Sequence, residues 1–290
     1  MTAIGALMSS LIDYAGLFPP ASLDMMSAVR RYREYLTHED RWILGKFVVP
    51  AARLKEFSAA FNEVCCGERE PVWRLSVLLS GDRASDEEAM EGLTRGAVSI
   101  DSVEIKAPSA MQADRLLQDW RAGPSSYVEF APAEAMAALP LLARLAARAK
   151  VRLGGVTAEA IPSTEVVAEF LAACARAKVA FKATAGLHHA VRGMYPLTYE
   201  PQSARAMMYG FVNVFLAAVL AYRGEDARVL TGTLEERKAS AFVFGEDNVR
   251  WHGFDAGVDE IETVRREFAI SYGSCSFSEP VEEANGHGWL

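Results

Sequence analysis

The sequence VAFKATAGLHH spans residues 179–189, and it predicts a buried strand that runs into a glycine turn. Lys182 lies in the middle of the strand, where lysine is rare unless it is paired or does chemistry. A desolvated lysine loses its proton readily and can attack a carbonyl carbon to form a Schiff base. The alternative is that Lys182 forms an ion pair with a carboxylate of a neighbouring strand and only holds the core together.

Strands of this kind alternate with helical segments along most of the chain. The predicted strands are Leu11–Phe18, Trp42–Val49, Trp73–Leu79, Ser102–Lys106, Tyr127–Phe130, Val151–Leu153 and Val179–Thr184. An Ala-rich helix is expected to run to Arg148, and a long helix to cover Ala204–Tyr222. Seven such units predict parallel strands covered by helices. The length of 290 residues, with no Gly-rich dinucleotide motif after the first strand, favours an α/β (βα)8 TIM-type barrel over an open doubly wound sheet.

The eighth unit is irregular in the sequence. Three segments are candidates for its strand: Arg228–Thr231, Ala241–Phe244 and Val249–Trp251. The polar stretch Ser271–Ser278 is expected to be a surface loop. We predict a single barrel domain over residues 1–280 and a polar C-terminal tail over residues 281–290.

The composition narrows the range of functions. Hydrophobic residues make up 51% of the chain and charged residues 23%, as in a soluble globular protein. The net charge of −8, with no basic block, argues against a nucleic-acid partner. No apolar run is long enough to span a bilayer, and no basic flank marks a secretory signal. Four cysteines (Cys65, Cys66, Cys174 and Cys275) lack CxxC spacing, so we expect a reduced, cytoplasmic protein, with homo-oligomer formation left open.

Strand alternation predicts which polar side chains face the barrel axis. The set is Asp13, Lys46, Glu104, Lys106, Glu129, Arg152 and Lys182. Burying so much charge is costly unless it is paired or useful, so the set predicts an active site. Its surplus of positive charge suits a small anionic substrate. Arg152 would clamp that anion, Lys46 and Asp13 would contact it, and the backbone N–H groups of Gly154 and Gly155 could cradle it.

Lys182-Ala-Thr-Ala-Gly186 is similar to the Lys-Thr-Ser-Thr-Gly motif of deoxyribose-phosphate aldolases, which are class I (Schiff-base) aldolases with a (βα)8 barrel. The resemblance implies a reactive lysine at Lys182, with Lys106 or Lys46 as a second lysine. It also implies an acid, Glu104 or Glu129, that moves protons through a water. Two features depart from the family: the lysine falls on the predicted seventh strand instead of the sixth, and no Gly-rich phosphate loop follows the last strand.

The paired histidines favour a different reading. His188 and His189 come just after the predicted seventh strand, at the catalytic end of a barrel. Together with Glu104 and Glu129, one of them could bind a divalent metal such as Mg²⁺, Mn²⁺ or Zn²⁺. His188 could instead act as a general acid or base without a metal. Cys275 has no paired histidine in the sequence, which argues against a thiol nucleophile.

Three functions therefore stand open. The first is a lyase of the aldolase type that acts on a small anionic carbonyl compound through a Schiff-base lysine, without a cofactor. The second is a metal-dependent lyase, isomerase or hydrolase, and the third is a barrel that only binds an anion. The first depends on the pKa of Lys182: like charge from Lys106 or Arg152 would lower it, whereas a direct ion pair with Glu104 or Glu129 would keep the lysine protonated.

Overall fold

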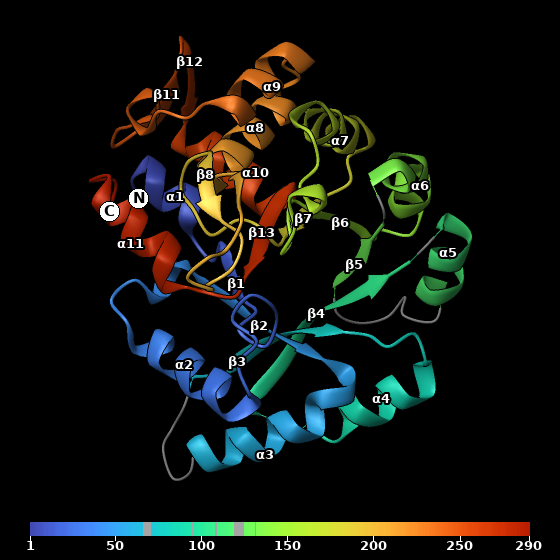
Figure 1. The fold of residues 1–290 in the computed structure, drawn as a ribbon. Helices are drawn as coiled ribbons and strands as arrows, with labels where there is room; N and C mark the ends of the chain where they lie inside the picture. The colour runs from blue at the N-terminus through green and yellow to red at the C-terminus, as the bar shows by residue number, and fades with distance from the viewer. Residues whose placement is uncertain (66–70, 94–95, 108, 119–124, 131) are drawn as a thin grey trace.

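Eight parallel strands close into a barrel, and helices ring it (Figure 1). The computed structural model describes residues 1–65, 71–93, 96–107, 109–118, 125–130 and 132–290. The barrel order is β1-β13-β7-β6-β5-β4-β3-β2. Its strands are β1 (Ile12–Tyr14), β2 (Leu44–Pro50), β3 (Trp73–Leu78), β4 (Val98–Lys106), β5 (Ser125–Glu129), β6 (Arg148–Arg152), β7 (Phe181–Thr184) and β13 (Ala269–Ser274). The predicted TIM-type fold is confirmed.

One helix precedes β1, and helices follow the barrel strands after it. They are α1 (Ala3–Met8), α2 (Met25–Thr37), α3 (Leu54–Val64), α4 (Arg83–Glu91), α5 (Ala110–Gln118), α6 (Pro132–Arg144), α7 (Thr164–Ala177), α8 (Phe211–Arg223), α9 (Ala227–Glu235), α10 (Val258–Glu267) and α11 (Ser278–Gly286). Single 3-10 turns cover Arg41–Ile43, Ala51–Arg53, Ala158–Ala160 and Ala239–Ala241. The Ala-rich helix α6 ends four residues earlier than predicted, because β6 begins at Arg148.

Aromatic rings fill the layer between β1–β3 and the helices outside them. Phe47 of β2 lies 5.4 Å, centroid to centroid, from both Tyr32 of α2 and Phe57 of α3. Trp73 at the start of β3 packs on Tyr32 at 4.8 Å. Every second side chain of these strands thus points outward into this core. The side chains between them, which include the charged residues, face the barrel axis.

The eighth barrel strand is β13, so all three segments proposed for it are wrong. Arg228–Thr231 lies inside α9, and the other two segments belong to a small antiparallel sheet of β10 (Val243–Phe244), β11 (Asn248–Trp251) and β12 (Phe254–Gly257). In β13 the inward positions carry Ser271 and Gly273, next to Lys182 and Thr184 of β7. These small inward side chains leave room for Lys182. Serine and glycine are also typical of loops, so the sequence of this strand resembles that of a loop.

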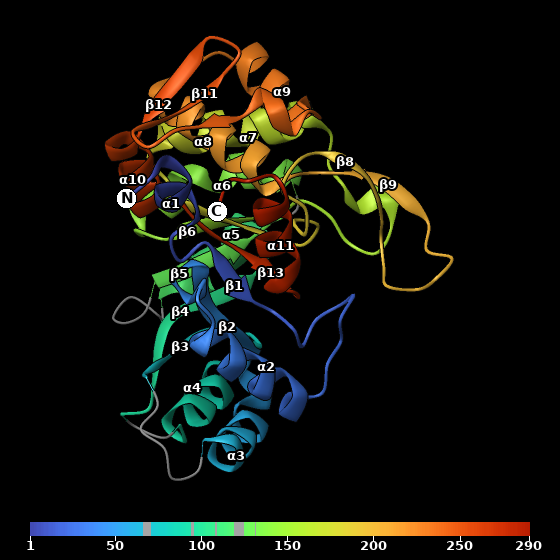
Figure 2. The ribbon, with the colours of Figure 1, turned by 90° about the vertical axis from the view of Figure 1, so that its left-hand side faces the viewer.

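The chain between β7 and β13 forms a long insertion that packs on the barrel through α8 and α10. It begins with a hairpin of β8 (Gly193–Pro196) and β9 (Arg205–Met208), so the helix predicted from Ala204 starts only at Phe211. The hairpin projects from the body on the same side as the loop that follows β1 (Figure 2).

The predicted polar tail is also wrong, because residues 278–286 form α11. Val281 and Ala284 of this helix are buried, and the Glu283 carboxylate accepts a hydrogen bond of 2.7 Å from the backbone N–H of Ala190. This end of the chain is therefore tied to the loop after β7. Among the described residues, no helix has the length and apolar character that crossing a membrane requires.

Candidate functional site

A continuous chain of ion pairs with alternating charge crosses the inside of the barrel. In order, its members are Lys46, Asp13, Lys182, Glu104, Lys150, Glu129 and Arg152. They come from β2, β1, β7, β4, β6 and β5. Four cations face three carboxylates, so the chain keeps the surplus of positive charge that the sequence predicted.

Lys182 is held at the centre of this chain and is almost fully buried, with 1% of its side chain exposed. Its Nζ lies 2.6 Å from Oδ2 of Asp13 and 2.7 Å from Oε1 of Glu104. The ring face of Tyr127 covers the ammonium group at 5.5 Å. Each of these contacts favours the charged form of the lysine.

The partner carboxylates are themselves fixed by hydroxyl groups. Ser271 donates a hydrogen bond of 2.8 Å to Asp13, and Ser76 donates one of 2.6 Å to Glu104. Ser102 in turn donates to Ser76 at 2.8 Å. Such bonds orient the carboxylates and leave them little freedom to move away from Lys182.

The pKa values follow from these contacts. Burial alone would lower the pKa of Lys182, but the charges of Asp13 and Glu104 more than offset it and hold the pKa above its ordinary value. Burial alone would likewise raise the pKa of Asp13 and Glu104, but the neighbouring lysines outweigh it and lower both. Lys182 therefore stays an ammonium group at neutral pH. The direct ion pair between Lys182 and Glu104 supports the alternative in which Lys182 only holds the core together. It therefore argues against Lys182 as the nucleophile.

Lys150 is the member of the chain that the sequence analysis missed. Its Nζ lies 2.8 Å from Glu104 and 2.7 Å from Glu129. The predicted strand began at Val151, so Lys150 was assigned to the preceding connection. The alternation in Arg148-Ala-Lys-Val-Arg152 was the available signal, because it puts Lys150 on the same parity as Arg152.

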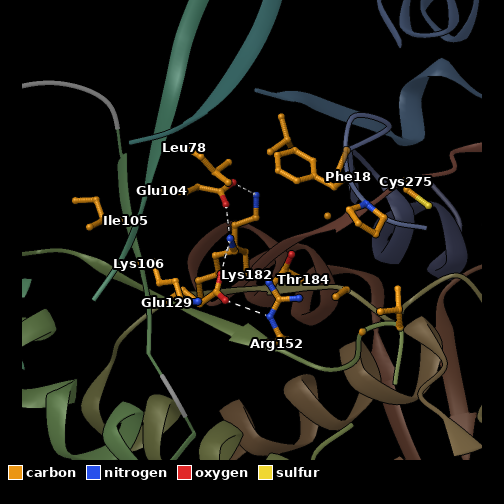
Figure 3. A pocket seen from close by; sticks show the side chains of 18 of the residues that line it. Phe18, Leu78, Glu104, Ile105, Lys106, Glu129, Arg152, Lys182, Thr184 and Cys275 are labelled. Atoms are coloured by element: carbon orange, nitrogen blue, oxygen red, sulfur yellow. Dashed lines mark hydrogen bonds and ion pairs between the residues drawn. The ribbon is translucent and has the colours of Figure 1, made fainter. Parts of the chain in front are cut away.

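A cavity of about 350 Å³ opens above the chain of ion pairs, at the carboxyl ends of the strands. Its charged lining consists of Glu104, Lys106, Glu129, Lys150, Arg152 and Lys182. Apolar side chains line it too, namely Phe18, Pro19, Val48, Leu78, Leu79, Ile105 and Val156. Figure 3 shows Phe18 and Cys275 on the opposite side of the cavity from Lys106 and Glu129.

The remaining predicted residues divide between the cavity and other places. Lys106 and Arg152 are exposed side chains at the rim, where they can meet an anion, and Gly155 also lines the cavity. Asp13 lies beneath the cavity and reaches it only through Lys182. Lys46 lines a different cavity, together with Ser9 and Arg265, at the amino-terminal ends of the strands, so its predicted substrate contact at the mouth is wrong.

Gly154 has a structural reason to be glycine. A side chain there would meet Cα of Gly186 at 2.8 Å, because the loops after β6 and β7 touch at this point. Gly186 has a positive φ of 74° and an equally close approach to Gly154. Gly154 does not line the cavity, so it holds two loops together and its predicted role as an anion cradle has no support.

The two histidines point to different partners. His188 lines the cavity, and its Nδ1 lies 3.3 Å from Glu279 of α11. His189 pairs with Glu283 at 2.6 Å and stacks on Tyr195 of β8. Within the described ranges, no three His, Cys, Asp or Glu side chains gather as a metal site would require. The carboxylates of Glu104 and Glu129 instead face lysines, so the donor set does not favour the divalent-metal alternative.

Comparisons of the chain with protein-family models, with curated proteins and with solved structures give no match. The (βα)8 fold is common among enzymes of unrelated chemistry. The function of this chain must therefore be argued from the side chains of its own cavity.

Proposed function

We propose that this barrel is a lyase of the aldolase type, which binds a small anionic carbonyl compound as a Schiff base on Lys150. The observation that carries the proposal is the placement of two lysines around one carboxylate. Lys182 and Lys150 both contact Glu104 and both line the cavity, but only 1% of the Lys182 side chain is exposed, against 7% for Lys150. The resemblance to the aldolase motif implied a reactive lysine on β7, whereas this proposal assigns that role to a lysine on β6.

Lys150 and Lys182 are paired neighbours on β6 and β7, so a fixed positive charge lies beside the Lys150 amine. The amine must lose a proton before it can attack a carbonyl carbon. Glu129, whose carboxylate lies 2.7 Å from Lys150 Nζ and reaches the cavity, is placed to accept that proton. Arg152 and Lys106 at the rim would bind the anionic group of the substrate.

The reaction then follows from these positions. The Lys150 amine attacks the carbonyl carbon, and the carbonyl oxygen leaves as water with protons delivered through Glu129. The resulting iminium ion accepts the electron pair of the bond between the α- and β-carbons as that bond breaks. Glu129 takes the proton of the hydroxyl group on the β-carbon, so the second fragment leaves as an aldehyde and an enamine remains on Lys150. Glu129 returns a proton to the enamine carbon, and water releases the product and the free lysine.

A test is borohydride reduction in the presence of pyruvate, glycolaldehyde or acetaldehyde, followed by peptide mass mapping. We expect a reduced adduct on Lys150, lost in Lys150→Met. Lys55→Met is the control, because Lys55 is an exposed lysine of α3 that does not line the cavity, and it should keep the adduct. An adduct on Lys182 instead would return the nucleophile to the residue predicted from the sequence.

An anion-binding barrel without chemistry is the second candidate, and one observation favours it. Lys150 Nζ lies 2.8 and 2.7 Å from two carboxylates, so the lysine is held in ion pairs and is not free to attack a carbonyl group in this arrangement. The same experiment separates the two candidates. No adduct on any lysine of the cavity across the panel, while a small oxo acid still raises the melting temperature, would favour the binding protein.

A further inference from the structure

Four side chains meet at the wall of the cavity formed by the loops after β7 and β13. Cys275 directly follows β13, and His188 comes four residues after β7. Cys275 Sγ lies 3.9 Å from both ring nitrogens of His188. The Tyr199 hydroxyl, from the loop between β8 and β9, is 3.6 Å from the same sulfur.

A carboxylate that also contacts the imidazole completes this group. Glu279, in the first turn of α11, lies 3.3 Å from Nδ1 of His188. Cys275 and His188 both line the cavity, so a molecule that enters it meets the sulfur. This arrangement could not be predicted from the sequence, because 87 residues separate the thiol from the histidine.

The charge of the His188 imidazole follows from its surroundings. Burial alone would lower the pKa of His188, but the hydrogen bonds and charges of Cys275 and Glu279 outweigh it and raise the pKa to about 9. The imidazole is therefore protonated at neutral pH. A positive imidazolium beside a thiol stabilises the thiolate, which is the reactive form of cysteine. Tyr199 and, more distantly, Tyr14 of β1 also face the thiol, and both are neutral at this pH because burial raises their pKa values.

We infer that Cys275, with His188, Glu279 and Tyr199, forms a reactive thiol site that takes a soft electrophile of the α,β-unsaturated carbonyl class. The thiolate sulfur bonds to the β-carbon as the carbon–carbon double bond opens. The displaced electron pair reaches the α-carbon, which takes the proton of the His188 imidazolium, so the product is a thioether and a neutral imidazole. This site is independent of the Schiff-base proposal, because it uses neither Lys150 nor Lys182.

The other described cysteines do not line this cavity. Cys174 of α7 is fully buried, and burial raises the pKa of its thiol. Cys65, at the end of α3, is buried on the outer side of the barrel, away from the cavity. Cys66 lies outside the described residues. Selective reaction at Cys275 would therefore report the site itself and not a general exposure of thiols.

The experiment is labelling of the native protein with limiting N-ethylmaleimide, itself an α,β-unsaturated dicarbonyl, with peptide mapping over time. At pH 7 we expect Cys275 to react at least about tenfold faster than Cys65 and Cys174. His188→Gln should lower the Cys275 labelling rate about tenfold at pH 7. At pH 10, where cysteine thiols in general are ionised, the variant and the wild type should react at similar rates.

His189→Gln is the matched control, because it changes the adjacent histidine, which faces Glu283, and should leave the Cys275 rate unchanged. Labelling of Cys275 no faster than the buried cysteines would overturn the inference. So would a wild-type rate in His188→Gln at pH 7. Melting curves of both variants show whether they are folded, and loss of rate in a folded His188→Gln protein alone supports the site.

Discussion

At the scale of single residues, the buried charge of Lys182 makes the two carboxylates beside it essential to stability. Asp13→Asn would leave the ammonium with one carboxylate, Glu104, and an amide in place of the other. Removing one partner of a buried ion pair leaves an uncompensated charge. We expect the free energy of unfolding at pH 7 to fall by about 3–5 kcal/mol, measured by chemical denaturation.

The pH dependence of this difference has a defined sign. The pKa of Asp13 is lower in the folded protein than its ordinary value of 3.8, so its contribution is present above that pH and is lost as the pH falls through the folded pKa. The difference in the free energy of unfolding between wild type and Asp13→Asn should therefore become smaller in acid. Glu56→Gln, which removes an exposed ion pair with Arg53, is the control and should change stability by less than about 1 kcal/mol. Equal losses in the two variants would refute the buried-charge argument.

Several residues of the site could be predicted from the sequence, because strand parity needs only local information. Parity placed Asp13, Glu104, Glu129 and Lys182 inside the barrel. It could not tell which carboxylate meets which lysine, since Asp13 and Lys182 are 169 residues apart in the chain. Lys150 was missed because the start of its strand was misplaced, and a shift in the start of a strand hides the first inward residue.

At the scale of elements, the loops after β6 and β7 depend on two glycines that touch. Gly154→Ala would put a methyl group 2.8 Å from Cα of Gly186, so the backbone of one of the two loops would have to shift. We expect a loss of about 1–3 kcal/mol in the free energy of unfolding. Gly232→Ala is the matched control: it lies within α9, where a methyl group meets only Trp251 at ordinary contact distance. Alanine there should stabilise the protein by about 0.5–1 kcal/mol, so opposite signs for the two variants test the contact.

Strands with a regular alternation of apolar side chains could be predicted from the sequence, and a strand of small polar residues could not. The strands from β2 to β7 carry apolar side chains on the outward parity, a pattern that a single sequence reveals. In β13, Ser271, Gly273 and Ser274 imitate a loop, although this strand pairs with β7 and β1. Its pairing depends on strands far away in the sequence, so local pattern could not assign it.

At the scale of the whole molecule, the barrel is closed by a strand that the chain supplies last. β13 lies between β1 and β7, and the insertion of residues 185–268 separates it from β7. Residues of β13 and of both neighbouring strands line the cavity. Gly273 lies on β13 and Cys275 directly after it, Ala15 directly follows β1, and Thr184 ends β7. The site is therefore complete only when the last strand is in place.

A chain that ends at Phe268 would lose β13 and α11, and with them Ser271, which donates to Asp13. Both β1 and β7 would become open edges, and the buried side chain of Tyr272 would leave the core. We expect this chain to show no cooperative thermal transition by circular dichroism. The control replaces residues 194–207 of the projecting hairpin with a two-residue turn, since Gly193 and Met208 are paired neighbours. Because the hairpin forms no part of the barrel, its loss should leave a cooperative transition within roughly 5 °C of the wild type. Cooperative melting of the truncated chain near the wild-type temperature would show that the barrel does not need its closing strand.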